Sequence, residues 1–161
     1  MYKKIMVPLD GSELAECVLP HVDGFVTECQ VETIIFVWVV EPHYSTLTAP
    51  ANPQISINMQ ENAKMLEEQE KSSAARYLKQ VISRVKHGGI KYKKEVLVGK
   101  VADSLVDYVE ANEIDLVLIA THGRSGISRW VRGSIADRVL RSSSAPVLMI
   151  RANDKGNGER R

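Results

Sequence analysis

The stretch that decides the fold is residues 114–134, which read IDLVLIATHGRSGISRWVRGS. The apolar run at 116–120 is typical of a buried strand, and the loop after it carries glycines and three arginines and ends at Gly133-Ser134, where a helix is expected. Glycine lets backbone N–H groups approach a ligand closely, and the first turn of a helix leaves N–H groups unpaired. Because both features and the guanidinium groups favour an anion in one place, the stretch predicts a site for the phosphates of a nucleotide.

The composition limits the classes to which the chain can belong. With 161 residues, of which 44% are hydrophobic and 25% charged, the sequence predicts one compact domain with a full core. We expect this domain to span residues 1–151 and a flexible tail to follow at 152–161.

The charge and the cysteine content indicate partners and compartment. A net charge of +1 gives no field strong enough to attract nucleic acid or a membrane surface, so neither is expected as a partner. Because no apolar run approaches the roughly 20 residues of a membrane span, and no basic segment precedes an apolar one, we expect a cytoplasmic protein. Cys17 and Cys29 make no disulfide framework and are expected to be small buried hydrophobic residues. The sequence shows no metal-binding motif.

Strand and helix signals alternate along the chain. Helices are expected from residue 13, where Pro20 should bend or divide the helix, over 59–87, from 101, and from 133. In the last helix, Ile135, Val139 and Leu140 are expected to face the core. The connection at 42–58 contains three prolines and no clear period, so we expect it to be irregular. Strands are expected at 5–9, 33–40, 90–98, 116–120 and 146–150.

This alternation predicts an α/β fold with a five-stranded parallel, doubly wound sheet and helices on both faces. In such sheets the ligand crevice lies beyond the carboxyl ends of the strands, where the strand order reverses. Asp10 follows the first strand, and Thr121-His122-Gly123 follows the fourth. If these two strands are neighbours, the two loops share one site.

These residues resemble the universal stress protein family over about residues 2–151. The run IMVPLDGS at 5–12 is similar to the family's first strand and turn, and THGRSG at 121–126 is similar to its loop. ATP-binding members carry Gly, two residues, Gly, nine residues, and then Gly-Ser or Gly-Thr. Gly123 and Gly133-Ser134 fit this pattern, whereas Ala120 replaces the first glycine. The resemblance implies a Rossmann-like fold of the adenine nucleotide α-hydrolase-like kind and ATP as ligand, bound with Mg²⁺ or Mn²⁺.

The family resemblance also assigns roles to single positions. Asp10 should lie near the ribose or adenine, with Pro8 and Leu9 beside it in the nucleotide site. The backbone of Val39 should meet the adenine edge. The residues that should surround the ribose and phosphates are Ala120, Gly123, Arg124, Ser125, Gly133 and Ser134.

Several of these residues also have a simpler interpretation. Asp10 can be a turn residue, because Asp-Gly-Ser is a common turn composition, and Ser134 can be a helix N-cap. Arg129 and Arg132 are interpreted as solvated loop charges. His122 has no carboxylate partner evident in the sequence, so we assign it no catalytic role. The methyl group of Ala120 can crowd the ligand or exclude backbone conformations that glycine allows.

The resemblance implies a nucleotide-dependent regulator in the stress response, with at most slow ATP hydrolysis. Two alternatives stay open: an enzyme that hydrolyses nucleotides or transfers nucleotidyl groups, and a structural dimer that binds no nucleotide. The glycine pattern is not that of a P-loop or of a dinucleotide-binding strand and turn, which disfavours the enzyme. An apolar edge strand at 146–150 would pair with another chain, and the resemblance implies a homodimer through that strand.

Overall fold

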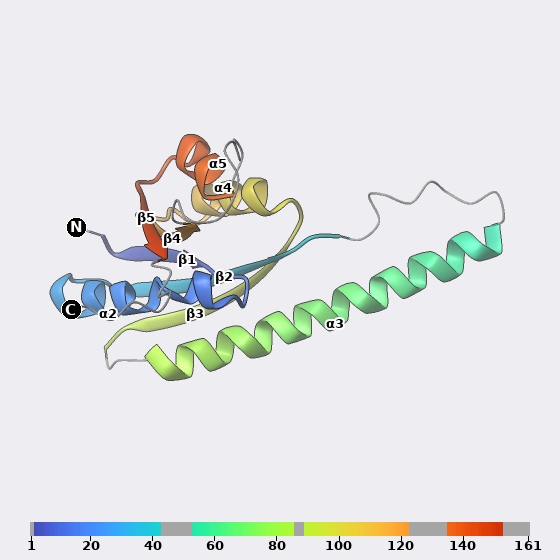
Figure 1. The fold of residues 1–161 in the computed structure, drawn as a ribbon, viewed down its shortest axis with the longest axis horizontal. Helices are drawn as coiled ribbons and strands as arrows, with labels where there is room; N and C mark the ends of the chain where they lie inside the picture. The colour runs from blue at the N-terminus through green and yellow to red at the C-terminus, as the bar shows by residue number, and fades with distance from the viewer. Residues whose placement is uncertain (1, 43–52, 86–88, 123–134, 153–161) are drawn as a thin grey trace, which may run out of the picture.

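The computed structural model describes residues 2–42, 53–85, 89–122 and 135–152. Its five strands pair in parallel in the order β3-β2-β1-β4-β5 (Figure 1). The strand order therefore reverses between β1 and β4, which confirms the doubly wound prediction. The strands are β1 (Lys4–Pro8), β2 (Thr33–Val40), β3 (Lys91–Val98), β4 (Leu116–His122) and β5 (Val147–Ala152).

The central strands are buried on both faces. Ile5, Met6 and Val7 of β1 have no exposed surface, and the same is true of Ile34 and Phe36 in β2. Branched and aromatic side chains pack well on a pleated surface, and a near-continuous run of them is typical of a parallel strand covered from both sides. The strand predicted at 33–40 is β2 from its first residue to its last.

Helices cover both faces of the sheet, as predicted. On one face α1 (Glu13–Glu16), α2 (Leu19–Glu28) and α3 (Pro53–Val85) pack on a core that includes Val22, Phe36 and Leu78. On the other face α4 (Val101–Ala111) and α5 (Ile135–Ser142) pack on a core that includes Leu105 and Val139. Pro20 lies in the first turn of α2, where its missing N–H costs no hydrogen bond, so the first predicted helix is divided in two.

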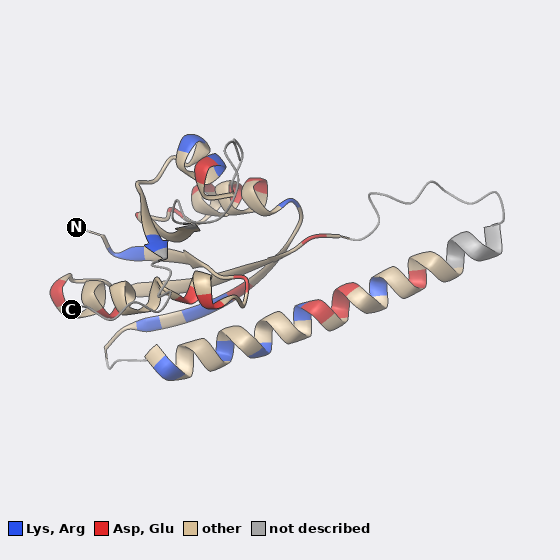
Figure 2. Cartoon of the chain, in the orientation of Figure 1, with Lys and Arg blue, Asp and Glu red and all other residues tan. Residues whose placement is uncertain are grey.

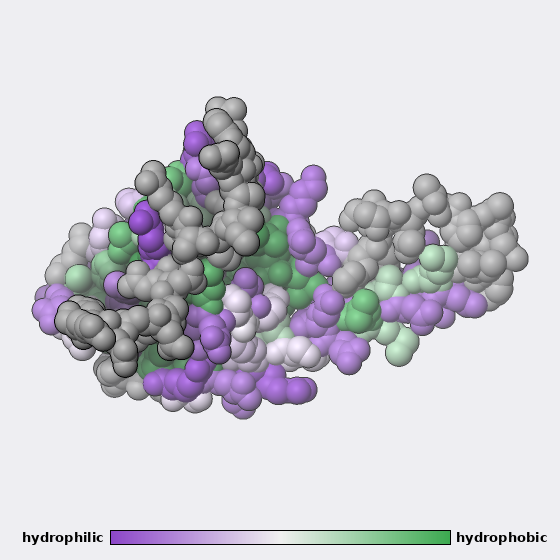
Figure 3. All heavy atoms as spheres, in the orientation of Figure 1, coloured by the Kyte–Doolittle hydropathy of each residue, from purple (hydrophilic) through white to green (hydrophobic). Residues whose placement is uncertain are grey.

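The helix α3 begins earlier than the sequence analysis expected. Residues 53–58 belong to it, so the predicted irregular connection is wrong over these positions. The difference arises at Pro53, because proline is typical of loops but also suits the first turn of a helix. The first half of α3 extends beyond the sheet (Figure 1) and carries Met65, 71% exposed, and Leu66, 43% exposed, among charged side chains (Figure 2, Figure 3).

Two of the three core positions predicted in α5 are also wrong. Ile135 and Leu140 are 45% and 42% exposed, whereas Ala136 and Val139 face the core. A helix of this length has only one narrow apolar stripe, and its packing against α4 selects the i, i+3 pair. The flexible tail was expected from residue 152, but Ala152 is the last residue of β5, so the tail prediction is wrong at this position. The rest of the tail, 153–161, and the predicted Gly133-Ser134 helix start lie outside the described residues. Within the described residues, no helix combines the length and the apolar character needed to cross a membrane.

Candidate functional site

The carboxyl ends of β1 and β4 lie side by side. The two strands pair in parallel, with Ile5 opposite Leu116 and Met6 opposite Val117. Because the strands are parallel, Asp10, which follows β1, and the end of β4 at His122 lie at the same edge of the sheet, where the strand order reverses. The condition set by the sequence analysis for one shared site is therefore met.

Asp10 belongs to a tight turn that leads from β1 into α1. Its Oδ1 atom accepts hydrogen bonds from the backbone N–H of Ser12 (3.0 Å) and from the Ser12 hydroxyl (2.6 Å). Ser12 in turn accepts a bond from the N–H of Ala15 at 3.0 Å and caps α1. Asp10 is exposed, so the turn interpretation holds and leaves the carboxylate at the edge of the sheet.

Pro8 and Leu9 lie at the same end of β1 but differ in what they present. Pro8 is half-buried, whereas the Leu9 side chain is 5% exposed and packs in the core beneath α1, α2 and α3. Only the main chain of Leu9 can therefore face a ligand. Its N–H already donates to the carbonyl of Val37 at 2.9 Å.

That bond determines which way the main chain of Val39 faces. Alternate residues of a strand direct their N–H and C=O groups to the same neighbour, so those of Val39 point, like those of Val37, toward β1. The register of β1 with β2 ends with Pro8 opposite Val37. The main-chain groups of Val39 consequently face the space beyond the end of β1. The Val39 side chain packs against the opposite core, beside α4.

Ala120 lies inside β4, opposite Ile150, and not in the loop. Its φ is negative, because Glu113 is the only residue other than glycine with a positive φ in the described part of the chain. Alanine is therefore compatible with the backbone here, and the conformational objection to Ala120 disappears. Its methyl group packs against the core beneath α1, α2 and α3. Crowding of a ligand by this methyl group stays an untested expectation.

The remaining predicted site residues lie outside the described residues. They are Gly123, Arg124, Ser125, Gly133 and Ser134, and the same holds for Arg129 and Arg132. The structure therefore describes the part of the candidate site that β1, β2 and β4 contribute.

Sequence reasoning missed a group of side chains behind the Asp10 turn. Gly11 has φ +81°, and a Cβ atom built on it would lie 2.8 Å from Cη2 of Trp38. Trp38 packs edge to face with Tyr77 of α3, with ring centroids 5.3 Å apart. The available signal was the glycine in Asp-Gly-Ser, which permits a positive φ directly after a strand.

Glu16 of α1 connects this group to α3. Its carboxylate accepts a bond from the Tyr77 hydroxyl at 2.8 Å and two from the Arg84 guanidinium at 2.8 and 3.0 Å. The bond from Arg84 is the main cause that lowers the pKa of Glu16, and the Tyr77 hydroxyl lowers that pKa further. Burial and the Glu16 carboxylate raise the pKa of Tyr77. Glu16 is therefore ionised at neutral pH and holds α1 against α3.

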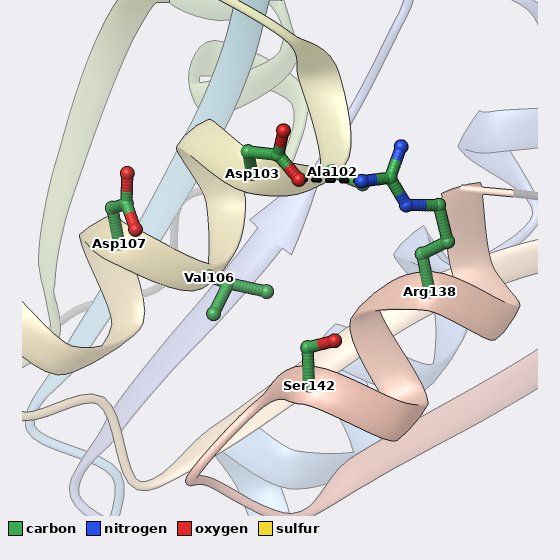
Figure 4. A pocket seen from close by; sticks show the side chains of 6 residues that line it. All are labelled: Ala102, Asp103, Val106, Asp107, Arg138 and Ser142. Atoms are coloured by element: carbon green, nitrogen blue, oxygen red, sulfur yellow. Dashed lines mark hydrogen bonds and ion pairs between the residues drawn. The ribbon is translucent and has the colours of Figure 1, made fainter.

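A small hollow between α4 and α5 has a different character. Its volume is about 180 Å³, below the roughly 300 Å³ at which ligand pockets begin, and an ion pair between Arg138 and Asp103 (2.6 Å) crosses it (Figure 4). The hollow is lined by Ala102, Asp103, Val106, Asp107, Arg138 and Ser142. We do not assign it to the candidate site at the carboxyl ends of β1 and β4.

The fold is that of a doubly wound α/β protein whose strand order reverses between β1 and β4. Residues 1–151 match the model of the Universal stress protein family, and the chain belongs to that family. The chain is similar to the universal stress protein MJ0577 of Methanocaldococcus jannaschii, with 28% identity over 158 residues that cover 94% of this chain and 96% of that protein. The solved structure of MJ0577 superposes with a TM-score of 0.75 at 26% identity and covers 96% of this chain and 99% of that one.

Two further solved structures share the fold. A universal stress protein in complex with cAMP has a TM-score of 0.66 at 18% identity, with 93% of this chain and 97% of that chain covered. The universal stress protein from Archaeoglobus fulgidus in complex with dAMP has a TM-score of 0.56 at 20% identity, with 92% and 97% covered. At these identities the likeness shows the shared fold.

Proposed function

We propose that the protein binds ATP, together with Mg²⁺ or Mn²⁺, at the carboxyl edge of β1, β2 and β4, and that nucleotide occupancy regulates a stress response. Membership of the family and the cAMP and dAMP complexes of proteins with this fold support an adenine nucleotide as ligand. The residues assigned to the nucleotide are Pro8, Leu9, Asp10, Val39, Ala120, Gly123, Arg124, Ser125, Gly133 and Ser134.

The observation that carries this proposal is the direction of the Val39 main chain. The N–H donor and the C=O acceptor of this one residue face the space beyond β1, on the same edge as the exposed Asp10 carboxylate. Such a pair matches the donor and acceptor on the edge of adenine, while Asp10 can accept bonds from ribose hydroxyls. The phosphates would then extend toward the loop after β4, whose glycines and Arg124 suit an anion.

The cation is expected to be held mainly by the nucleotide. Within the described residues, no group of three or more metal-ligating side chains is present. This fits Mg²⁺ in nucleotide sites, which keeps several waters and takes one or two protein ligands besides the phosphates. The cation would neutralise phosphate charge, and Arg124 would add a positive charge of the chain's own beside the phosphates.

The free edges of the sheet favour a homodimer through the strand at 146–150. Both β3 and β5 are edge strands, but β3 presents exposed lysines at 91, 93 and 94, a common device against edge pairing (Figure 2). In contrast, β5 presents Leu148 and Met149, which are 41% and 40% exposed. We therefore propose that β5 pairs with β5 of a second copy around a two-fold axis.

The proposal places the protein in the cytoplasm, without nucleic acid or membrane as partner. Cys17 and Cys29 are both free thiols, as is usual in a reducing compartment. Both cysteines are half-buried and pack against the core as small hydrophobic residues.

Two measurements test the nucleotide proposal. Mass spectrometry of the purified protein should find a co-purified adenine nucleotide, and ATP with Mg²⁺ should raise the melting temperature. The stabilisation at a hundredfold excess over the dissociation constant is expected to be about 2.7 kcal/mol. If neither ATP, AMP nor cAMP shifts the melting temperature at millimolar concentration, the nucleotide proposal fails and the alternative of a structural dimer without a nucleotide is favoured. Steady release of phosphate at a rate far above the background would instead favour the enzyme.

A further inference from the structure

We propose that Glu16, Trp38, Tyr77 and Arg84, here called the Glu16 cluster, are positioning residues that fix the Asp10–Ser12 turn and thereby hold the Asp10 carboxylate at the nucleotide edge. This inference rests on the proposed function. It adds residues from β2, α1 and α3 that no site pattern in the sequence includes.

The first step is that the turn is held from two sides. On one side Trp38 fills the space next to Gly11, where an added Cβ would lie 2.8 Å from Cη2 and 3.1 Å from Cζ3 of the indole. On the other side, Ser12 caps α1 while its N–H and hydroxyl bind Asp10 Oδ1. A movement of α1 therefore moves Ser12, and with it the carboxylate that Ser12 binds.

The second step is that α1 cannot hold this position alone. It has four residues, and isolated helices need roughly 12–15 residues to be even marginally stable. Glu16, its last residue, receives three hydrogen bonds from α3, from Tyr77 and from both terminal nitrogens of Arg84. Bidentate guanidinium–carboxylate pairs fix orientation as well as distance.

The third step is that the two supports meet. Tyr77 binds Glu16 through its hydroxyl and packs through its ring against Trp38. The contacts around the turn thus form a closed circuit. It runs through Asp10, Ser12, Glu16, Tyr77, Trp38 and Gly11. When a binding group lies on a flexible loop, the loop must be ordered on binding, and this cost weakens the affinity for the ligand. A closed circuit of contacts orders the loop before the ligand binds.

The experiment compares two tyrosine hydroxyl groups. The hydroxyl of Tyr77 binds α1, and the hydroxyl of Tyr92 binds the end of α3. Tyr77→Phe removes the bond to Glu16. Tyr92→Phe is the matched control, because the Tyr92 hydroxyl donates to the carbonyl of Val85 at the end of α3. With Mg-ATP as probe in calorimetry, we expect Tyr77→Phe to weaken binding about fivefold, about 1 kcal/mol, and Tyr92→Phe to change it less than about twofold. Equal affinities of the two variants would overturn the proposal.

A rescue experiment separates positioning from a general loss of stability. Gly11→Ala should weaken ATP binding, because its methyl group would collide with Trp38 and its φ of +81° disfavours alanine. Adding Trp38→Phe should return part of the affinity, since the shorter ring frees that space while the strain in φ persists. Weaker binding in the double variant than in Gly11→Ala would count against a positioning role for Trp38.

Hydrogen exchange keeps the inference testable apart from the proposed function. In the nucleotide-free protein, Tyr77→Phe should speed exchange at the N–H groups of Ser12 and Ala15, which bind Asp10 and Ser12 respectively, and Tyr92→Phe should not. If wild-type protein binds no nucleotide, the proposed function fails, and exchange alone decides whether the Glu16 cluster fixes the turn. Unchanged exchange in Tyr77→Phe would overturn the inference whatever the affinity.

Discussion

The carboxylate of Asp115 binds the backbone of Lys4. Its Oδ2 atom accepts the N–H of Lys4 at 2.7 Å and that of Lys3 at 2.9 Å, while the N–H of Asp115 donates to the carbonyl of Lys4 at 2.9 Å. Asp115 directly precedes β4, and Lys4 begins β1. These bonds join the amino ends of the two strands whose carboxyl ends form the proposed site, so they set the register on which that site depends.

Asp115→Ala should therefore lower the free energy of unfolding. The change removes two bonds to a charged acceptor and leaves two backbone N–H groups to be satisfied by water, for an expected loss of about 1–3 kcal/mol. Asp115→Asn keeps one acceptor oxygen and should lose less. Urea denaturation checks the order wild type, Asn, Ala, and a loss in Ala no larger than in Asn would contradict this role.

The sequence predicts elements best where one cause dominates. Residues 33–40 form β2 as expected, because an uninterrupted branched and aromatic run fits only a strand buried on both faces. Pro53 is ambiguous because proline suits both loops and helix starts. Ile135 was predicted wrongly because the sequence of a short helix does not show which side forms its single narrow apolar stripe.

The sequence proposes positions for the candidate site but does not show which side chains support them. Asp10 and Val39 follow from strand ends and from the family resemblance. The contact of Trp38 with Gly11 and of Glu16 with Tyr77 joins residues 27 and 61 positions apart, and no periodicity within one element shows such pairs. The direction of the Val39 main chain likewise required the register of β1 with β2.

Ala120→Gly should bind ATP at least as tightly as wild type. Ala120 needs no glycine conformation, so the substitution removes only a methyl group, which packs against the core beneath α1, α2 and α3. Gly133→Val should abolish binding, because the resemblance places this glycine against the phosphates. Gly24→Val is the matched control, since a Cβ at Gly24 meets no atom within 4 Å. Calorimetry with ATP and circular dichroism check the set, and several-fold weaker binding by Ala120→Gly would refute our account of this position.

Glu16 should make folding stability depend on pH in the acidic range. The Arg84 guanidinium and the Tyr77 hydroxyl lower the pKa of Glu16 in the folded protein below the unfolded value of about 4.3. A lowered folded pKa means that the stabilisation is fully present above the unfolded pKa and is lost as pH falls through the folded pKa.

Wild-type protein should consequently be more stable than Glu16→Gln at pH 7, and the difference should shrink between about pH 5 and pH 3. Glu68→Gln is the control, because Glu68 forms an exposed pair with Lys71 within α3 and no contact with another element is expected to change. Urea midpoints across this range check the prediction. A difference between wild type and Glu16→Gln that is constant with pH would show that the Glu16 charge is not what holds α1.

The last prediction concerns the free edge of β5. The N–H of Val117 donates to the carbonyl of Pro146, so residues 146, 148 and 150 direct their main-chain groups toward β4, and residues 147 and 149 direct theirs away from the sheet. A proline at Leu148 would therefore damage the ladder inside the protomer, whereas a proline at Met149 removes a donor from the free edge.

Met149→Pro should shift the protein from dimer to monomer while ATP affinity changes little. Met149→Ala is the control, because it shortens the side chain but keeps the donor, and it should weaken the dimer less. Sedimentation equilibrium at micromolar concentration measures both. A wild-type monomer under these conditions would refute pairing through β5. A Met149→Pro dimer as stable as wild type would place the interface elsewhere, with the exposed Met65 and Leu66 of α3 as the next surface to substitute.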